Sequence, residues 1–158
     1  MKKLYLVRHA KTIDFGYEDD FNRYLTPFGR ESASRLGLFL KEKLDELPQI
    51  MTSSALRTVQ TSEIVAQEIG FDIEKIQKFD NLYEASPETI LTLIQELPKT
   101  LHSVMIVNHN PAISAIGNYL VGNKLPSFST GMVACIDLED WTKSQYHEGK
   151  LVFFKDFH

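Results

Sequence analysis

Two arginines and two histidines of this sequence lie where apolar segments end and polar residues begin. Arg8 and His9 directly follow one such segment, Arg57 comes shortly after a second, and His109 directly follows a third. Paired guanidinium groups favour a tetrahedral dianion, because each can donate two parallel, charge-assisted hydrogen bonds. A neutral imidazole beside them can attack phosphorus. These residue types therefore predict a site for phosphate chemistry.

The same set suggests how the work of phosphoryl transfer would be divided. One imidazole would attack phosphorus, which divides a slow hydrolysis into two faster steps, and the other, when protonated, would donate to the transferring oxygens. A helix that begins near Ala55 would direct free backbone N–H groups at the same anion. No carboxylate cluster suited to Mg²⁺ is evident in the sequence, so we expect positive side chains in its place, no metal and no cofactor.

Each candidate taken alone has a simpler interpretation, as a structural histidine or as a solvated arginine at a helix start. A His–His metal site is a sharper alternative, but it needs a third ligand, and the remaining histidines are interpreted as surface or terminal residues: His102, His147 and His158. Ligands of open α/β sheets bind outside the carboxyl ends of the strands. The occurrence of candidates at three such ends therefore favours a phosphate site.

The elements that would position these residues alternate between short apolar runs and amphipathic helices. Strands are expected at residues 4–7, 49–52, 103–107, 132–138 and 151–154. Helices are expected after Thr26-Pro27 with an apolar face reaching Leu47, from residue 55 to about 69 before Gly70, after Ser86-Pro87 with an apolar face reaching Leu97, and from Pro111 to about residue 120. This alternation predicts a single α/β domain over residues 1–158, with a mainly parallel central sheet in a three-layer α/β/α arrangement.

Composition excludes several other classes of protein. The 158 residues are 43% hydrophobic and 24% charged with a net charge of −4, which is typical of a globular protein and argues against nucleic-acid binding. The lone Cys135 excludes an intramolecular disulfide and a Cys-based zinc site, and its apolar neighbours predict a core position. The apolar run after Met1 is too short for a signal peptide or a membrane span, so we expect a cytoplasmic protein without membrane contact.

The segments that carry the candidates resemble the motifs of the histidine phosphatase superfamily, also called phosphoglycerate mutase-like. Their order and spacing are similar to those of the short SixA-type phosphohistidine phosphatases, over about residues 3–138. The matching segments are residues 4–12, 53–61 and 107–111, together with residues 20–26, Gly29 and residues 82–85. The resemblance implies a phosphoglycerate mutase-like fold.

The resemblance also implies roles for individual residues. His9 would be the nucleophile that becomes phosphorylated, and Arg8, Arg57 and His109 would form the phosphate pocket. The hydroxyl of Ser53 and the backbone N–H of Asn110 would make minor contacts with the phosphate.

Glu84 and Arg23 each keep two interpretations. Glu84 is the nearest candidate for the general acid of larger relatives, or else a loop residue before the Ser86 cap. Loss of a positioned general acid typically lowers the rate by about 10²–10⁴-fold. This loss matters most for esters, because the imidazole of a phosphoramidate can leave already protonated. Arg23 would reach the pocket or a partner protein, or form a surface ion pair within an acidic run expected to be solvated: Glu18, Asp19 and Asp20.

The resemblance favours a metal-independent phosphatase whose substrate is phosphohistidine on a partner protein. The short chain leaves little room for the insertions that enclose small substrates, and an open pocket suits a phosphoryl group presented by another protein. Two alternatives stay open: a small-molecule phosphomonoesterase of the same superfamily, and a catalytically silent phosphate-binding regulatory module. The joint presence of Arg8, His9, Arg57 and His109 argues against the silent module, which has no chemical reason to keep a nucleophile.

Overall fold

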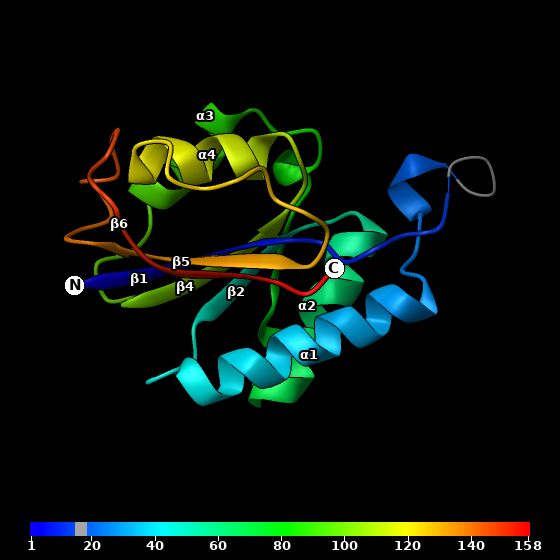
Figure 1. Cartoon of the computed structure of the whole chain (residues 1–158). Coiled ribbons are helices and arrows are strands. Elements are labelled where there is room, and N and C mark those ends of the chain that lie inside the picture. Colours follow the sequence, from blue (N-terminus) through cyan, green and yellow to red (C-terminus); the bar gives the residue numbers. More distant parts are fainter. Residues whose placement is uncertain (15–18) are drawn as a thin grey trace.

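The computed structural model describes residues 1–14 and 19–158, and within these ranges it contains one mixed sheet of six strands (Figure 1). The strand order is β3-β2-β4-β1-β5-β6. Neighbours among the first four strands in this order pair in parallel, whereas β5 pairs antiparallel with both β1 and β6. The strands are β1 (Lys2–Arg8), β2 (Gln49–Ser53), β3 (Gln77–Phe79), β4 (Ser103–Asn108), β5 (Met132–Leu138) and β6 (Lys150–Asp156).

Helices cover both faces of this sheet and complete the predicted three-layer α/β/α arrangement (Figure 1). One face packs against α1 (Pro27–Lys43) and α2 (Leu56–Ile69), and the other against α3 (Pro87–Gln95) and α4 (Ala112–Val121). Three short 3₁₀ turns are η1 (Asp20–Asn22), η2 (Ile73–Lys75) and η3 (Asp80–Leu82). The sheet therefore separates two apolar cores, and Cys135 is buried in one of them, as predicted.

The helix boundaries follow from local signals in the sequence. The side chain of Thr26 accepts a hydrogen bond from the backbone N–H of Gly29 at the start of α1, and Ser86 does the same for Thr89 at the start of α3. The helix α2 ends at Gly70, whose φ of 84° lies in the left-handed region that favours glycine. These three predicted boundaries are confirmed.

Three expectations about the helices and strands were wrong. The helix α3 ends at Gln95, so Leu97 is buried but lies outside it. The helix α1 ends at Lys43, so Leu44 is its C-cap and Leu47 is 50% exposed in the following loop. Pro48 explains why Leu47 is not helical, because the residue before a proline is disfavoured in the helical region. Sequence reasoning also missed β3, a three-residue edge strand without apolar alternation.

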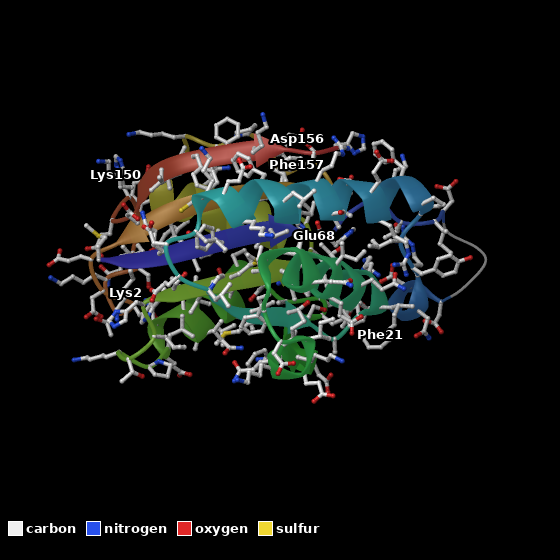
Figure 2. All side chains as sticks on the ribbon, turned by 90° about the horizontal axis from the view of Figure 1, so that it is seen from below. Lys2, Phe21, Glu68, Lys150, Asp156 and Phe157 are labelled. Atoms are coloured by element: carbon white, nitrogen blue, oxygen red, sulfur yellow. The ribbon has the colours of Figure 1, made fainter. Side chains whose placement is uncertain are left out.

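The parallel strands bring the predicted site residues to one end of the sheet. The register of β1 and β4 pairs Arg8 with Asn108, and β2 ends at Ser53 beside them. Figure 2 shows Lys2 at the start of β1 and Phe21 near the opposite end of the molecule, beyond the end of that strand. In the described ranges, no helix is long and apolar enough to cross a membrane.

Candidate active site

The structure brings the predicted histidines and arginines together in one cavity. The ring centroids of His9 and His109 lie 5.4 Å apart. Both rings line a cavity of about 320 Å³, which we call the main cavity. Its other walls include the predicted residues Arg8, Arg23, Arg57 and Asn110.

The hydrogen bond of His9 determines which ring nitrogen is free to react. Its Nδ1 lies 2.8 Å from the backbone oxygen of Ala10, and a carbonyl oxygen only accepts, so Nδ1 carries the proton and Nε2 keeps its lone pair. Burial, together with the nearby His109 and the two arginines, lowers the pKa of His9 to about 3. At neutral pH this side chain is therefore an uncharged nucleophile held in one tautomer.

His109 is held by Ser53, the residue at the end of β2. The Nε2 of His109 and the Oγ of Ser53 are 2.9 Å apart, and the same Oγ accepts a hydrogen bond from the backbone N–H of Ala55 at 3.2 Å. Burial and the charge of Arg57 lower the pKa of His109 to about 4, so its ring is uncharged without a bound anion. Its buried Nδ1 has no hydrogen-bond partner among the described residues.

Arg8 and Asn110 both donate to the backbone oxygen of Phe128, at 2.9 and 2.8 Å. The Oδ1 of Asn110 also accepts from the hydroxyl of Ser114, so this side chain connects α4 to the backbone at Phe128. In the described part of the chain, the buried Nε of Arg8 has no partner, and burial next to Arg57 lowers the pKa of Arg8. An anion in the main cavity could accept from that nitrogen. A contact from the Asn110 backbone N–H stays a prediction.

Asp20 links the site residues, and the expectation of a solvated acidic run was wrong for it. Arg57 donates from Nη1 to the Asp20 backbone oxygen at 2.6 Å and from Nη2 to its carboxylate at 3.1 Å. Arg23 and the hydroxyl of Tyr83 also donate to this carboxylate, at 3.1 and 2.6 Å. Asp19 is exposed as expected, and Glu18 lies outside the described residues.

The position of Arg23 is compatible with both of its interpretations. It lines the main cavity, and it also forms an ion pair with Asp20. Its Nη2 donates to the hydroxyl of Thr12 at 2.7 Å and to the backbone oxygen of Ile13 at 3.1 Å. Arg23 is therefore anchored to the wall of the cavity while its charge faces the site.

Glu84 lies at an adjoining cavity of about 300 Å³, which we call the side cavity. Its lining includes Tyr83, Glu84 and Asn108, and it shares Arg57, His109 and Asn110 with the main cavity. Glu84 is exposed and has a φ of 59° in the loop that precedes the Ser86 cap. This position is compatible with both of its interpretations.

His158 is a surface residue at the end of the chain, as interpreted from the sequence, and it also contributes to the site. It is exposed, but it lines the main cavity, and its Nδ1 lies 2.8 Å from the hydroxyl of Thr130. His102 and His147 are exposed and line neither the main nor the side cavity. Across residues 1–14 and 19–158, no three side chains of His, Cys, Asp or Glu form a group that could hold a metal ion.

Two known proteins are similar to this chain in sequence. The chain is 29% identical over 121 residues to the uncharacterized protein ML1117 of Mycobacterium leprae, covering 74% of this chain and 72% of that protein. It is 33% identical over 86 residues to the mitochondrial serine/threonine-protein phosphatase Pgam5 of Drosophila ananassae, covering 54% of this chain. The match to Pgam5 spans only 29% of that relative's length.

Solved structures resemble the chain over nearly its full length. A protein assigned as phosphohistidine phosphatase SixA from Agrobacterium tumefaciens has a TM-score of 0.83 at 28% identity, covering 98% of this chain and 97% of that one. The protein histidine phosphatase SixA bound to tungstate has a TM-score of 0.85 at 20% identity, with the same coverage. The family model of the histidine phosphatase superfamily (branch 1) matches residues 4–96, more than half of the chain. With this match, the chain belongs to the histidine phosphatase superfamily.

Proposed function

We propose that this protein is a metal-independent phosphatase that removes the phosphoryl group from phosphohistidine on a partner protein, through a phosphohistidine intermediate at His9. The observation that carries the proposal is the state of His9 itself. Its ring is buried and uncharged, with Nδ1–H donated to the Ala10 oxygen, and it shares a cavity with Arg8 and Arg57. A neutral imidazole presented to an anion site is suited to attack phosphorus.

In the first step, the Nε2 of His9 forms a bond to phosphorus while the bond from phosphorus to the substrate nitrogen breaks. The electron pair of the broken bond stays on the leaving imidazole. His9 becomes a phosphorylated imidazolium, and the Ala10 carbonyl oxygen, which accepts the Nδ1–H, stabilises that positive charge. Arg8 and Arg57 bind the phosphoryl oxygens throughout the transfer.

In the second step, water attacks the phosphorus of the intermediate, and the bond to Nε2 breaks. The electron pair returns to Nε2 and the proton of the water goes to the phosphate product, so His9 regains its neutral starting state. Because the Nδ1–H stays on the ring in both steps, phosphorylated His9 is itself a good leaving group. No separate acid is needed to release it.

His109 changes its charge state in this account. Without a ligand it is uncharged, because burial and Arg57 lower its pKa to about 4. A phosphoryl dianion in the main cavity favours the protonated form of a neighbouring imidazole. His109 would then donate a hydrogen bond to the transferring oxygens, with the Ser53 hydroxyl holding the ring in place. With Arg8 and Arg57, this supplies the positive charge that a metal ion provides in other phosphatases.

The substrate class is proposed from the leaving group and from the relatives. An imidazole can leave without a strong acid, whereas the alcohol of an ester depends on one. The SixA structure at 28% identity comes from a protein assigned to phosphohistidine dephosphorylation. Both points favour phosphohistidine over a phosphate ester.

Substrate profiling in the presence of a chelator tests this proposal. We expect the protein to release phosphate from a small protein carrying phosphohistidine, with a kcat/KM well above that for a phosphoserine peptide, and His9→Ala to release none. Equal or higher activity on the ester would instead identify a phosphomonoesterase. Binding of orthovanadate without turnover of any substrate would identify a silent module.

The location of Glu84 favours the phosphomonoesterase as the second candidate. Glu84 lines the side cavity, next to the main cavity, where its carboxyl group could protonate a leaving alcohol. In that case Glu84→Gln would lower ester hydrolysis by about 10²–10⁴-fold. A small effect of this substitution on phosphohistidine hydrolysis is expected from a phosphohistidine phosphatase.

A further inference from the structure

We infer that the side cavity is the binding site of the leaving group, that it takes the protonated imidazole ring of the substrate, and that Asn108 is the residue that recognises this ring. The inference rests on the proposed function, because it concerns the same reaction. It adds a specificity residue that the sequence analysis did not single out.

Asn108 has an unusual environment for an amide. It is 1% exposed, and neither its Oδ1 nor its Nδ2 has a hydrogen-bond partner among the described residues. Leaving a buried polar group unpaired costs about 1–3 kcal/mol, so such groups call for an explanation in a native protein. A ligand that pairs with the amide would account for it.

The strand geometry directs Asn108 toward the side cavity. Alternate residues of β4 lie on opposite faces of the sheet, and Val104 and Ile106 belong to the core beneath α3 and α4. Asn108 continues this series at the end of the strand. Leu82 and Ala112, which line the side cavity, belong to the same core. Asn108 therefore belongs to the inner wall of this cavity, with its buried amide on the same side of the sheet.

The two cavities differ in the charged side chains that line them. The charged side chains lining the main cavity in the described ranges are mostly cationic: Arg8, Lys11, Arg23 and Arg57, against the single carboxylate of Asp14. Those lining the side cavity are the carboxylate of Glu84 and the ion pair between Asp20 and the shared Arg57. A phosphoryl group fits the first set, and a cationic group next to it fits the second.

The wall of the side cavity also suits a flat ring. Tyr83 lines it and meets the ring of His109 edge-on, with 5.8 Å between the ring centroids. Aromatic rings prefer such offset or edge-on neighbours at about 4.5–7 Å. The shared residues Arg57 and His109 place this cavity directly beside the phosphoryl position.

These features match the reacting form of phosphohistidine. When its second ring nitrogen carries a proton, the ring is cationic while the phosphoryl group is attached. Attack by His9 breaks the bond from phosphorus to nitrogen, the electron pair stays on that nitrogen, and a neutral imidazole leaves with its other N–H intact. In the side cavity this N–H donates to the Oδ1 of Asn108, and the Glu84 carboxylate stabilises the positive charge of the ring while it is still bonded to phosphorus.

Two substrates with different leaving groups test the role of Asn108. We expect Asn108→Ala to lower kcat/KM for phosphohistidine by about 10- to 100-fold, the range for a hydrogen bond to a charged group. The same variant should lower kcat/KM for 4-nitrophenyl phosphate, whose leaving group is not cationic, by a clearly smaller factor. Ser103→Ala is the matched control, because it removes a buried hydroxyl without a described partner from the other end of β4.

The outcomes separate this inference from the proposed function. A wild-type protein that hydrolyses 4-nitrophenyl phosphate but not phosphohistidine overturns the proposed substrate, and the inference with it. If the wild-type protein hydrolyses phosphohistidine but Asn108→Ala lowers kcat/KM equally for both substrates, or for neither, only the leaving-group site is overturned.

A second measurement does not require a substitution at a buried position. With orthovanadate in the main cavity, imidazole at about pH 6 should bind more tightly than pyrazole, its isomer that stays neutral. Glu84→Gln, at an exposed position, should reduce that preference by about threefold or more. Equal binding of the two rings, or a preference unchanged in the variant, would contradict a site for a cationic ring.

Discussion

Removal of the Asp20 carboxylate should lower the free energy of unfolding. This group accepts hydrogen bonds from the hydroxyl of Tyr83 at 2.6 Å and from Arg23 and Arg57 at 3.1 Å each. Partial burial alone would raise the pKa of Asp20, but these donors outweigh burial and lower it from 3.8 to about 2. We expect Asp20→Asn to destabilise the folded protein, because a neutral amide cannot replace a carboxylate that accepts from all three.

The pKa shift sets the magnitude and the pH range of the effect. A shift of about two units corresponds to about 2.5 kcal/mol, and because the side chain is 34% exposed, solvent screening reduces this to about 1–2 kcal/mol. The stabilisation is fully present above about pH 5, where the carboxyl is ionised even in the unfolded chain. It is lost as the pH falls toward about 2, where the folded carboxyl takes up its proton.

Urea unfolding of the wild type and the variant measures this difference. Asp19→Asn is the matched control, since it removes an equal charge while an asparagine can still cap η1, and it should change the free energy of unfolding by less than about 0.5 kcal/mol. A double-mutant cycle with Tyr83→Phe should give a coupling of about 1 kcal/mol. The reasoning is refuted if Asp20→Asn costs no more than the control, or if its cost is unchanged at about pH 3.

Three further predictions follow from the geometry. Gly29→Ala would place a Cβ against the backbone oxygen of Lys11 and should lower the free energy of unfolding by about 3 kcal/mol or more. Gly70→Ala meets open space but requires a positive φ, so it should lower the free energy of unfolding by only about 1–2 kcal/mol. Equal losses for the two variants in urea melts would contradict this. Because the pKa values of His9 and His109 are lowered to about 3 and 4, the unfolded chain binds more protons, so stability should fall by about 2 kcal/mol or more from about pH 7 to about pH 5; a wild-type curve that stays flat over this range would exclude it. Arg57→Lys keeps the charge but loses the planar guanidinium group, and it should lower kcat/KM by about 10- to 100-fold. Near-normal steady-state kinetics in this variant would count against bidentate binding of the phosphoryl group by Arg57.

The sequence predicted the main residues of the site because they follow directly from strand ends. Arg8 is the last residue of β1, His9 directly follows it, and His109 directly follows β4. A correct prediction of parallel strands therefore also brings these residues together. The same reasoning placed Ser53 at the end of β2. Local capping signals fixed the helix starts at Thr26 and Ser86 in the same way.

Features that depend on loops could not be predicted in this manner. Asp20 contacts Arg57 only because the segment after β1 folds back over α2, and no periodicity encodes that return. The position of His158 beside the main cavity likewise depends on how β6 pairs with β5, and the antiparallel direction of that pairing was not predicted. Asn108 was read as part of a motif, but its unpaired amide is visible only when its neighbours are known.

The central claim is that His9 carries the phosphoryl group during turnover. Rapid-quench mixing of the protein, in chelator, with a small protein bearing radiolabelled phosphohistidine tests it most directly, with His9→Ala as the control after its fold has been checked by urea unfolding. We predict transient, acid-labile label on the wild type, located in the peptide that contains His9, absent from the variant, and decaying as phosphate is released. Release of phosphate with no label on the protein at any time, or full activity in His9→Ala, would contradict the account.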